Sequence, residues 1–109
     1  MLESVKSEQR RQTILREIAR LGPVISGNLS VRYTRCAGAG CHCRADPPVL
    51  HGPYPTWKHQ VEGRQVTTTL KPAQVKKMRA ALAAHRRLQE LIKELEELSI
   101  VDVQSRWDD

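Results

Sequence analysis

Large apolar side chains are scarce in this sequence of 109 residues. It contains no Phe, and only 4% of its residues are aromatic: Tyr33, Tyr54, Trp57 and Trp107. Because aromatic side chains bury more area than most others, a core built with so few of them is small. The length excludes two ordinary domains. We therefore expect one domain, residues 1–109, that needs a source of stability besides its apolar core.

Long hydrophobic runs are also missing, and the mean hydropathy is -0.51. No segment approaches the roughly 20 apolar residues that a membrane-spanning helix requires. The beginning of the chain contains acidic side chains and no apolar stretch, so it does not predict a secretion signal. From these features we expect a cytoplasmic protein with no membrane partner.

Acidic residues are outnumbered: 18 Lys and Arg stand against 12 Asp and Glu, giving a net charge of +6 and a pI near 9.7. Such an excess favours an acidic partner, most commonly nucleic acid. Between Gly22 and Leu70 the only carboxylate residues are Asp46 and Glu62. The sequence shows no paired acids, Ser/His/Asp set or phosphate-binding glycine loop. We therefore expect neither an enzyme nor a small-molecule substrate.

The pattern of apolar residues predicts an α+β fold. Helical spacing indicates an N-terminal helix over residues 4–21. Alternating apolar residues predict one strand over residues 28–35, and two Thr- and Val-rich segments predict a β-hairpin over residues 56–70. The Gly- and Pro-rich stretch over residues 37–54 is expected to be loop. The strand and hairpin should form a small antiparallel sheet.

A long helix is predicted over residues 72–98, because Pro72 suits a first helical position and no Gly or Pro follows it. Its apolar seam is Met78, Ala81, His85, Leu88, Ile92 and Leu95, and Ala84, Leu91 and Leu98 widen the stripe. Such a helix is roughly 40 Å long. We expect it to pair with the N-terminal helix as a helical hairpin and with a second copy as a homodimer. The tail, residues 99–109, is expected to pack loosely.

Three cysteines lie within eight residues, as Cys36-x4-Cys41-x-Cys43, in the segment over residues 28–70. An odd number of cysteines argues against a disulfide framework. A dense Cys cluster in a Gly/Pro loop is typical of a metal site, and a fourth ligand from His51 would give a Cys3His set. That set is the structural arrangement for zinc, so we expect one Zn²⁺ per chain in a zinc knuckle.

Several residues besides His51 could in principle supply the fourth ligand. His51 follows a loop long enough to fold back to the cysteines. His42 lies between two candidate ligands, where its side chain would point away. Asp46 suits a thiolate-rich site poorly, and His59 belongs to the expected hairpin. His51 is therefore the preferred candidate.

Positive charge is concentrated in two places. Six basic residues and no acid lie from Lys71 to Arg87, whereas Glu predominates from residue 90 to 97. This order opposes the helix macrodipole, so helix stability does not explain it. Further basic residues surround the knuckle and hairpin. The candidates for contacting nucleic acid are Arg32, Arg35, Arg44, Lys58, Arg64, Lys76, Lys77, Arg79, Arg86 and Arg87.

The strings from Gly27 to Cys36, Cys41-His42-Cys43 and His51-Gly52-Pro53-Tyr54, followed by a helix that begins at Lys71-Pro72, resemble a family of small bacterial proteins. The family is known only as a domain of unknown function, and its members often lie near transposase genes. The resemblance spans roughly residues 15–98. It implies a metal-binding knuckle on the same Cys and His residues and a link to mobile DNA. It supplies no known activity.

Two functional hypotheses follow. The first is a zinc-stabilised accessory or regulatory protein that binds nucleic acid, with DNA preferred over RNA as the partner. The second is a protein-interaction module, in which the heptad helix forms a dimer or docks a larger partner. Antiparallel pairing of the basic and acidic halves of that helix would then explain the reversed charge order. Such a dimer should weaken as salt is raised.

Overall fold

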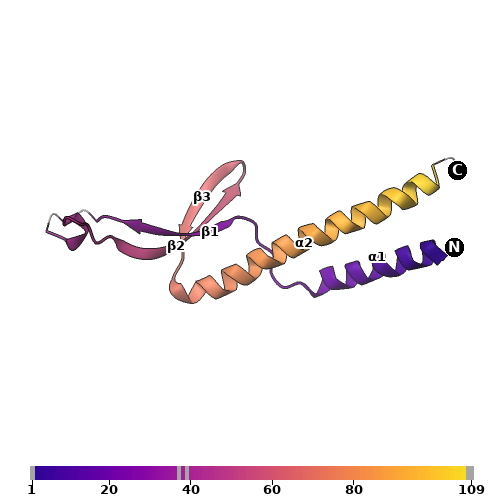
Figure 1. Ribbon diagram of the computed structural model, residues 1–109, viewed down its shortest axis with the longest axis horizontal. Helices are drawn as coiled ribbons and strands as arrows, with labels where there is room; N and C mark the ends of the chain where they lie inside the picture. The colour runs from indigo at the N-terminus through magenta and orange to yellow at the C-terminus, as the bar shows by residue number, and fades with distance from the viewer. Residues whose placement is uncertain (1, 37, 39, 108–109) are drawn as a thin grey trace. The chain divides into compact units, whose positions relative to one another are not determined.

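The structure is a computed structural model that describes residues 2–36, 38 and 40–107, with side chains described from residue 5 onward. It confirms the predicted α+β fold, in which two helices accompany one three-stranded antiparallel sheet (Figure 1). The elements are α1 (Leu2–Arg20), β1 (Asn28–Thr34), the short 3-10 helix η1 (His42–Arg44), β2 (His51–Val61), β3 (Arg64–Thr69) and α2 (Pro72–Ser105). No helix in the described ranges is long and apolar enough to span a membrane.

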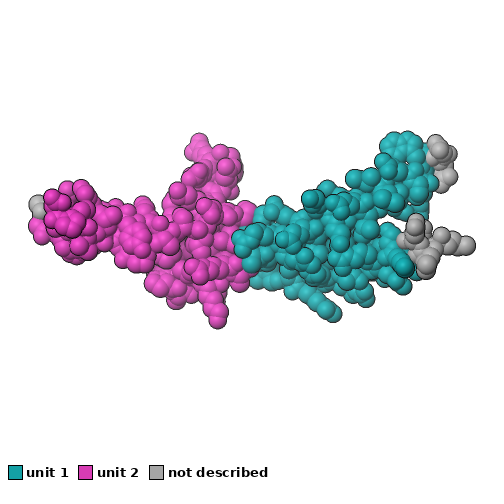
Figure 2. Space-filling model, viewed as in Figure 1, with its two compact units in different colours: residues 1–25, 83–109 teal, residues 26–82 magenta. Residues whose placement is uncertain are grey.

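The chain forms two compact units, coloured separately in Figure 2. Unit 1 comprises residues 1–25 and 83–109, and therefore holds α1 and most of α2. Unit 2 comprises residues 26–82 and holds the sheet, the cysteine cluster and the first turns of α2. Each unit has its own buried side chains, so each is described separately.

Unit 1 is the predicted helical hairpin, in which α1 and α2 lie side by side (Figure 1). Arg10 pairs with Glu94 and Glu17 pairs with Arg87. From the first pair to the second, the residue number rises by seven on α1 and falls by seven on α2. The two helices are therefore antiparallel in one register over two helical turns. Ile14 is 0% exposed. It lies between the two ion pairs in this register, at the centre of the hairpin.

The apolar seam of α2 differs from the prediction by one position. Leu91 is 1% exposed, whereas Ile92, which was predicted in the seam, is 41% exposed. The sequence could not settle this choice, because adjacent apolar residues both satisfy a heptad pattern. The facing helix α1 decides it. The buried seam accordingly continues through Leu88 and Leu95, which are both partly buried.

The predicted end of α2 at residue 98 is wrong, because the helix continues to Ser105. No Gly or Pro interrupts this segment. Ser99 also donates its hydroxyl to the Leu95 carbonyl at 2.8 Å, as helical serines commonly do. The predicted loose tail is thus helical over most of its length. It exposes apolar side chains, including Ile100 and Val103, instead of packing them.

The sheet of unit 2 has the order β1-β2-β3. The β2–β3 hairpin turns at Glu62 and Gly63, whose φ angles of 51° and 78° are both positive, as a two-residue type I′ turn requires. Strand β2 begins at His51, five residues before the predicted hairpin, so part of the expected loop is strand. The extra residues pair with the end of β1, where Thr34 opposes His51 after a bulge.

The buried interior of unit 2 is small. Among the described residues from 26 to 82, the buried apolar side chains are Cys43, Leu70, Ala81 and Leu82, and Thr56 is the buried polar one. A Leu side chain contributes about 1.5–3 kcal/mol when fully buried. The unit therefore has little apolar burial for its length, as the composition predicts.

Candidate metal centre

The four predicted metal ligands come from the ends of three elements. Cys36 follows β1 by two residues, Cys41 and Cys43 belong to the turn that contains η1, and His51 is the first residue of β2. Because Thr34 and His51 pair across the β1–β2 ladder, Cys36 and His51 reach the same end of the sheet. The long β2 is therefore what delivers the histidine.

Backbone hydrogen bonds shape the turn between Cys41 and Val49. The amide of Arg44 donates to the Cys41 carbonyl at 3.0 Å. The amides of Ala45 and Val49 both donate to the His42 carbonyl, at 3.1 and 3.2 Å. The turn leaves Cys43 fully buried. Each of these bonds closes a short loop, so the local sequence can form the turn without long-range packing.

The ligand atoms of Cys36, Cys41, Cys43 and His51 all lie within 4.8 Å of one another. The sulfurs of Cys36 and Cys43 are 3.6 Å apart, and the Cys41 sulfur is 3.1 Å from His51 Nε2. A tetrahedral ion with metal–sulfur bonds of about 2.3 Å separates its sulfurs by about 3.8 Å, so this spacing fits one shared ion. All three cysteines are free thiols. The residues thus lie close enough to bind one metal ion.

Hydrogen bonds favour the thiolate form of Cys36. The backbone amide of Gly38, followed by the neighbouring Cys and His51 side chains, lowers the pKa of the Cys36 thiol from 9.0 to about 6. The amide of Cys43 lowers the pKa of Cys41, but burial and the adjacent thiols outweigh it and raise that pKa overall. Coupled thiols compete in this way, because two thiolates in contact repel each other.

Further contacts hold the cysteine loop. The Cys36 amide donates to the Cys43 sulfur at 3.3 Å, and the Arg44 guanidinium donates to the Cys36 carbonyl at 2.8 Å. Amide bonds to ligand sulfurs reduce their charge and orient them. Arg44, which was predicted to contact nucleic acid, therefore also closes this loop. Its position directly after Cys43 in the sequence did not signal this role.

The alternatives for the fourth ligand lie outside the set of four. His42 Nδ1 lies 3.8 Å from the Cys41 sulfur, and His42 is not one of the four clustered residues. His59 stacks on Trp57 in β2, with ring centroids 3.5 Å apart and planes 7° from parallel. Asp46 lies in the loop after η1 and does not join the cluster. The structure therefore brings His51, and not these residues, to the three sulfurs.

Residues 5–80, well over half of the chain, match the family model described as Domain of unknown function (DUF6788). The chain belongs to this family. The matched span includes the whole cysteine and histidine cluster, in agreement with the resemblance in the sequence. No curated protein and no solved structure matches the chain. The function of this DUF6788 protein must therefore be inferred from its own residues.

The two units of this DUF6788 protein carry very different charges. Unit 2 has nine Lys and Arg residues and only two acidic ones, Asp46 and Glu62, which gives +7. Unit 1 has nine basic and ten acidic residues, which gives -1. The whole excess of positive charge thus belongs to the unit that holds the cysteine cluster.

Eight of the ten predicted nucleic-acid contacts lie in unit 2, and Arg86 and Arg87 lie in unit 1. All ten are exposed. Arg87 is engaged by Glu17 and by Glu90, which lies 3.0 Å away. These bonds raise the pKa of Arg87 and lower that of Glu17. Arg87 therefore acts first as a helix-pairing residue, unlike the other candidates. The Lys and Arg residues of unit 2 make no ion pair within the described part of the chain.

The α1–α2 pairing also accounts for the reversed charge order of α2. Helix α1 is rich in Arg and lies antiparallel to the acidic second half of α2. The Arg10–Glu94 pair is one direct contact between them. Glu94 and Glu90, in the acidic half of α2, therefore have cationic partners within their own chain. An antiparallel second copy is not needed to explain them.

Proposed function

We propose that this protein is a zinc-stabilised nucleic-acid-binding protein, with duplex DNA as its partner and an accessory or regulatory role. The observation that carries the proposal is the charge of unit 2, which is +7 on the 57 residues from Ser26 to Leu82 that surround the cysteine cluster. Unit 1, which is almost neutral, shows that this excess is not a general property of the composition.

Zinc is the metal that this donor set favours. Three thiolates and an imidazole select a soft or borderline divalent ion with tetrahedral geometry. All four tetrahedral positions would be filled by protein side chains, so no position is open for water or substrate. We therefore infer one structural Zn²⁺ per chain, whose role is to hold the turn of Cys41 and Cys43 against the sheet. A metal site without an open coordination position supports a binding function for the protein, not a catalytic one.

The cations of unit 2 suit a phosphate backbone. Lys76, Lys77 and Arg79 are exposed on the first turns of α2, and Arg32 and Arg35 are exposed on and just after β1. Each cation that neutralises a phosphate releases a counterion, so the logarithm of the affinity falls with the logarithm of the salt concentration at a slope of about -0.9 per contact. Strong salt dependence is therefore an expected property.

The experiment is a salt titration of binding to mixed-sequence duplex and single-stranded probes, measured by fluorescence anisotropy with zinc-loaded protein. Lys76→Glu with Arg79→Glu should weaken duplex binding and reduce the salt slope by about 2. The matched control is Lys93→Glu with Arg106→Glu, which changes the total charge equally but lies in unit 1. It should leave the slope unchanged. Absence of binding, or equal effects of both pairs, would refute the proposal.

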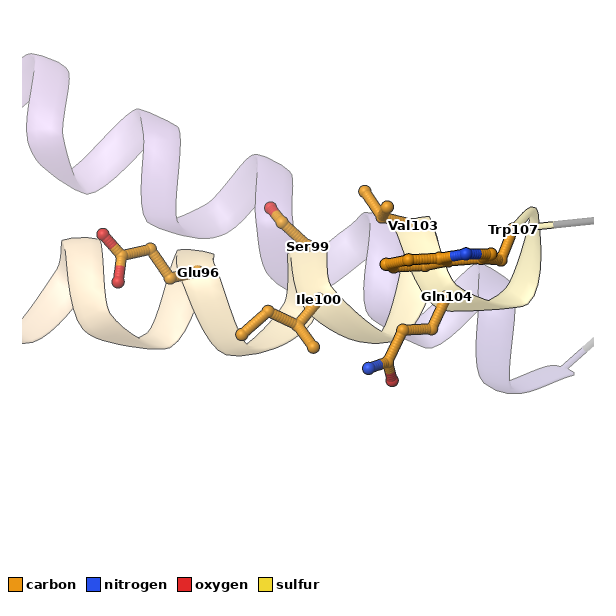
Figure 3. A pocket seen from close by; sticks show the side chains of 6 residues that line it. All are labelled: Glu96, Ser99, Ile100, Val103, Gln104 and Trp107. Atoms are coloured by element: carbon orange, nitrogen blue, oxygen red, sulfur yellow. The ribbon is translucent and has the colours of Figure 1, made fainter.

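A second candidate function is self-association through the end of α2. Ile100, Val103 and Trp107 are 54%, 57% and 72% exposed and line one hollow of about 470 Å³ with Glu96, Ser99 and Gln104 (Figure 3). These positions recur every three or four residues, so they form one helix face, distinct from the seam at Leu91. Apolar faces of this kind are typical of coiled-coil contacts, and we infer a second copy of this chain as the occupant.

Sedimentation equilibrium separates this candidate from the first. Ile100→Glu should convert a dimer to a monomer, whereas Val101→Glu, at a 67% exposed position that does not line the hollow, should not. Because the contact is apolar, the dimer should persist at high salt. A wild-type monomer at all accessible concentrations would refute self-association and leave the nucleic-acid proposal intact.

A further inference from the structure

The polar side of the β2–β3 hairpin carries groups that the metal centre does not use. The strand register places Asn28 opposite Lys58, and Gln60 opposite Gln65. Because side chains alternate between the two faces of a strand, these four residues share one face. All four are exposed. They form a contiguous patch across three strands.

This patch is hollowed. A depression of about 360 Å³ is lined by Asn28, Lys58, Gln60 and Gln65, together with Ser26, Gly27 and His59. No carboxylate lines it. Within the described part of the chain, the four polar side chains that share the face make no hydrogen bond to other protein groups, so their donors and acceptors are available to a ligand.

We propose that this patch reads base edges in the major groove of duplex DNA, which deepens and rests on the proposed function. Three carboxamides and one ammonium group are the chemistry of base recognition. Asn and Gln can bond adenine through its N6 donor and N7 acceptor at once, and Lys bonds guanine O6 and N7.

A phosphate backbone alone does not account for these residues. Phosphate oxygens only accept hydrogen bonds, so a phosphate would engage only the NH2 half of each carboxamide. A base edge presents a donor beside an acceptor, which matches both halves of a Gln or Asn side chain. The carboxamides therefore point to a ligand that presents hydrogen-bond donors beside acceptors. The +7 charge of unit 2 points to a nucleic acid.

The shape of the element agrees with this assignment. The major groove of B-form DNA admits a two-stranded β-ribbon, and β2 and β3 extend past the last β1 pair as such a ribbon from His59 to Val66. Both strands are exposed toward their turn, where Gln60 and Gln65 lie. The groove of A-form RNA is too deep and narrow for side chains to read, so duplex DNA is the favoured ligand.

The experiment uses the full-length, zinc-loaded protein. Sites are first selected from a random duplex DNA pool, and affinities for the selected and a scrambled duplex are then compared. Gln60→Ala with Gln65→Ala should reduce the preference for the selected site by at least about 5-fold, because each good base contact contributes about 5- to 150-fold. Binding to the scrambled duplex should change less than about twofold, because phosphate contacts remain.

The matched control is Thr68→Ala, an exposed position of β3 on the opposite face. It should keep the preference of the wild type. Zinc content and circular dichroism of each variant establish that the fold is retained. The conservative variant Gln65→Asn should show a weaker preference than the wild type, because its amide is carried on a side chain one methylene shorter.

The outcomes distinguish the two proposals. Salt-dependent duplex binding without any selected sequence would overturn base reading and leave the proposed function standing. So would a selected sequence whose preference survives the double Gln substitution. Tighter selective binding to RNA than to DNA would overturn base reading and also the choice of duplex DNA as the partner. Absence of binding to every nucleic-acid probe would overturn both. A selective loss in the double variant, with normal binding to the scrambled duplex, is the result that supports base reading.

Discussion

Loss of the fourth ligand should unfold the knuckle. His51→Ala removes the imidazole that lies 3.1 Å from the Cys41 sulfur, and His42→Ala removes a neighbouring imidazole that is not one of the four. Both substitutions remove a His side chain, and the two positions are nine residues apart. We expect the first to abolish stoichiometric Zn²⁺ binding and the second to preserve it.

The magnitude follows from how little else holds unit 2 together. Leu70 and Leu82, which are 8% and 6% exposed, contribute about 3–6 kcal/mol together, and Ala81 adds less. A structural Zn²⁺ contributes about 10–16 kcal/mol of apparent free energy in zinc-finger peptides at neutral pH. The metal contribution therefore exceeds that of the two buried Leu side chains. Its loss should unfold residues 36–51 and uncouple the Thr34–His51 end of the sheet.

Three measurements follow this change. Native mass spectrometry counts Zn²⁺ ions and chains together. X-ray absorption should give zinc–sulfur distances of about 2.3 Å and a zinc–nitrogen distance of about 2.0–2.1 Å, with three sulfurs and one nitrogen. Hydrogen exchange, with and without a zinc chelator, locates the loss of protection. Exchange should rise across residues 34–51 in His51→Ala and in the chelated wild type, but not in His42→Ala.

Two results would refute this reasoning. One is a chelated wild-type protein whose exchange across the knuckle equals that of the untreated protein. The other is equal zinc loss in the two histidine variants, which would show that the spacing of Cys36, Cys41, Cys43 and His51 does not define the binding set.

Three further outcomes test other parts of the structure. Leu91→Ala should lower the free energy of unfolding by about 2–5 kcal/mol in denaturant titrations, whereas Ile92→Ala should change it by less than about 1 kcal/mol; equal effects would contradict the helix register. The pKa of Glu17 is lowered from 4.5 by its hydrogen bonds to arginine, so its contribution to stability is complete above about pH 4.5 and is lost as the pH falls through the lowered value. Exchange of α1 amides should therefore rise on acidification, and Glu17→Gln should flatten this dependence. Gly52→Ala should weaken zinc binding, because its φ is 141° and a Cβ would lie 2.9 Å from backbone and ring atoms of β1. Gly63→Ala, whose φ of 78° strains only the hairpin turn and whose Cβ meets open space, should keep zinc affinity.

The metal-centre residues could be predicted because their spacing is local. Three cysteines within eight residues cannot separate far in space, and the Gly-rich insert allows a tight turn. The identity of the fourth ligand was a weaker prediction, since His42, His51 and His59 all lie near in sequence. The pairing of Thr34 with His51 selects among them, and that pairing depends on a bulge that no short motif announces.

Other errors of prediction have a common physical cause. Ile92 and Leu91 both fit a helical stripe, and only the position of Ile14 on the facing helix decides which is buried. The residues after Leu98 were expected to be a loose tail because they are polar and end in acids. The helix continues there without a buried face, because no Gly or Pro interrupts it before Ser105.

The sequence by itself determined the α+β content, the cysteine cluster and the sign of the charge, because each depends on residue type and local spacing. Tertiary structure alone decided which histidine joins the sulfurs, which side of α2 is buried and how the charge divides between the two units. These properties arise when segments distant in the chain meet, as α1 meets α2 and β1 meets β2. The register between two paired segments is set by how their faces pack against each other. The sequence of one strand or helix alone does not specify this packing.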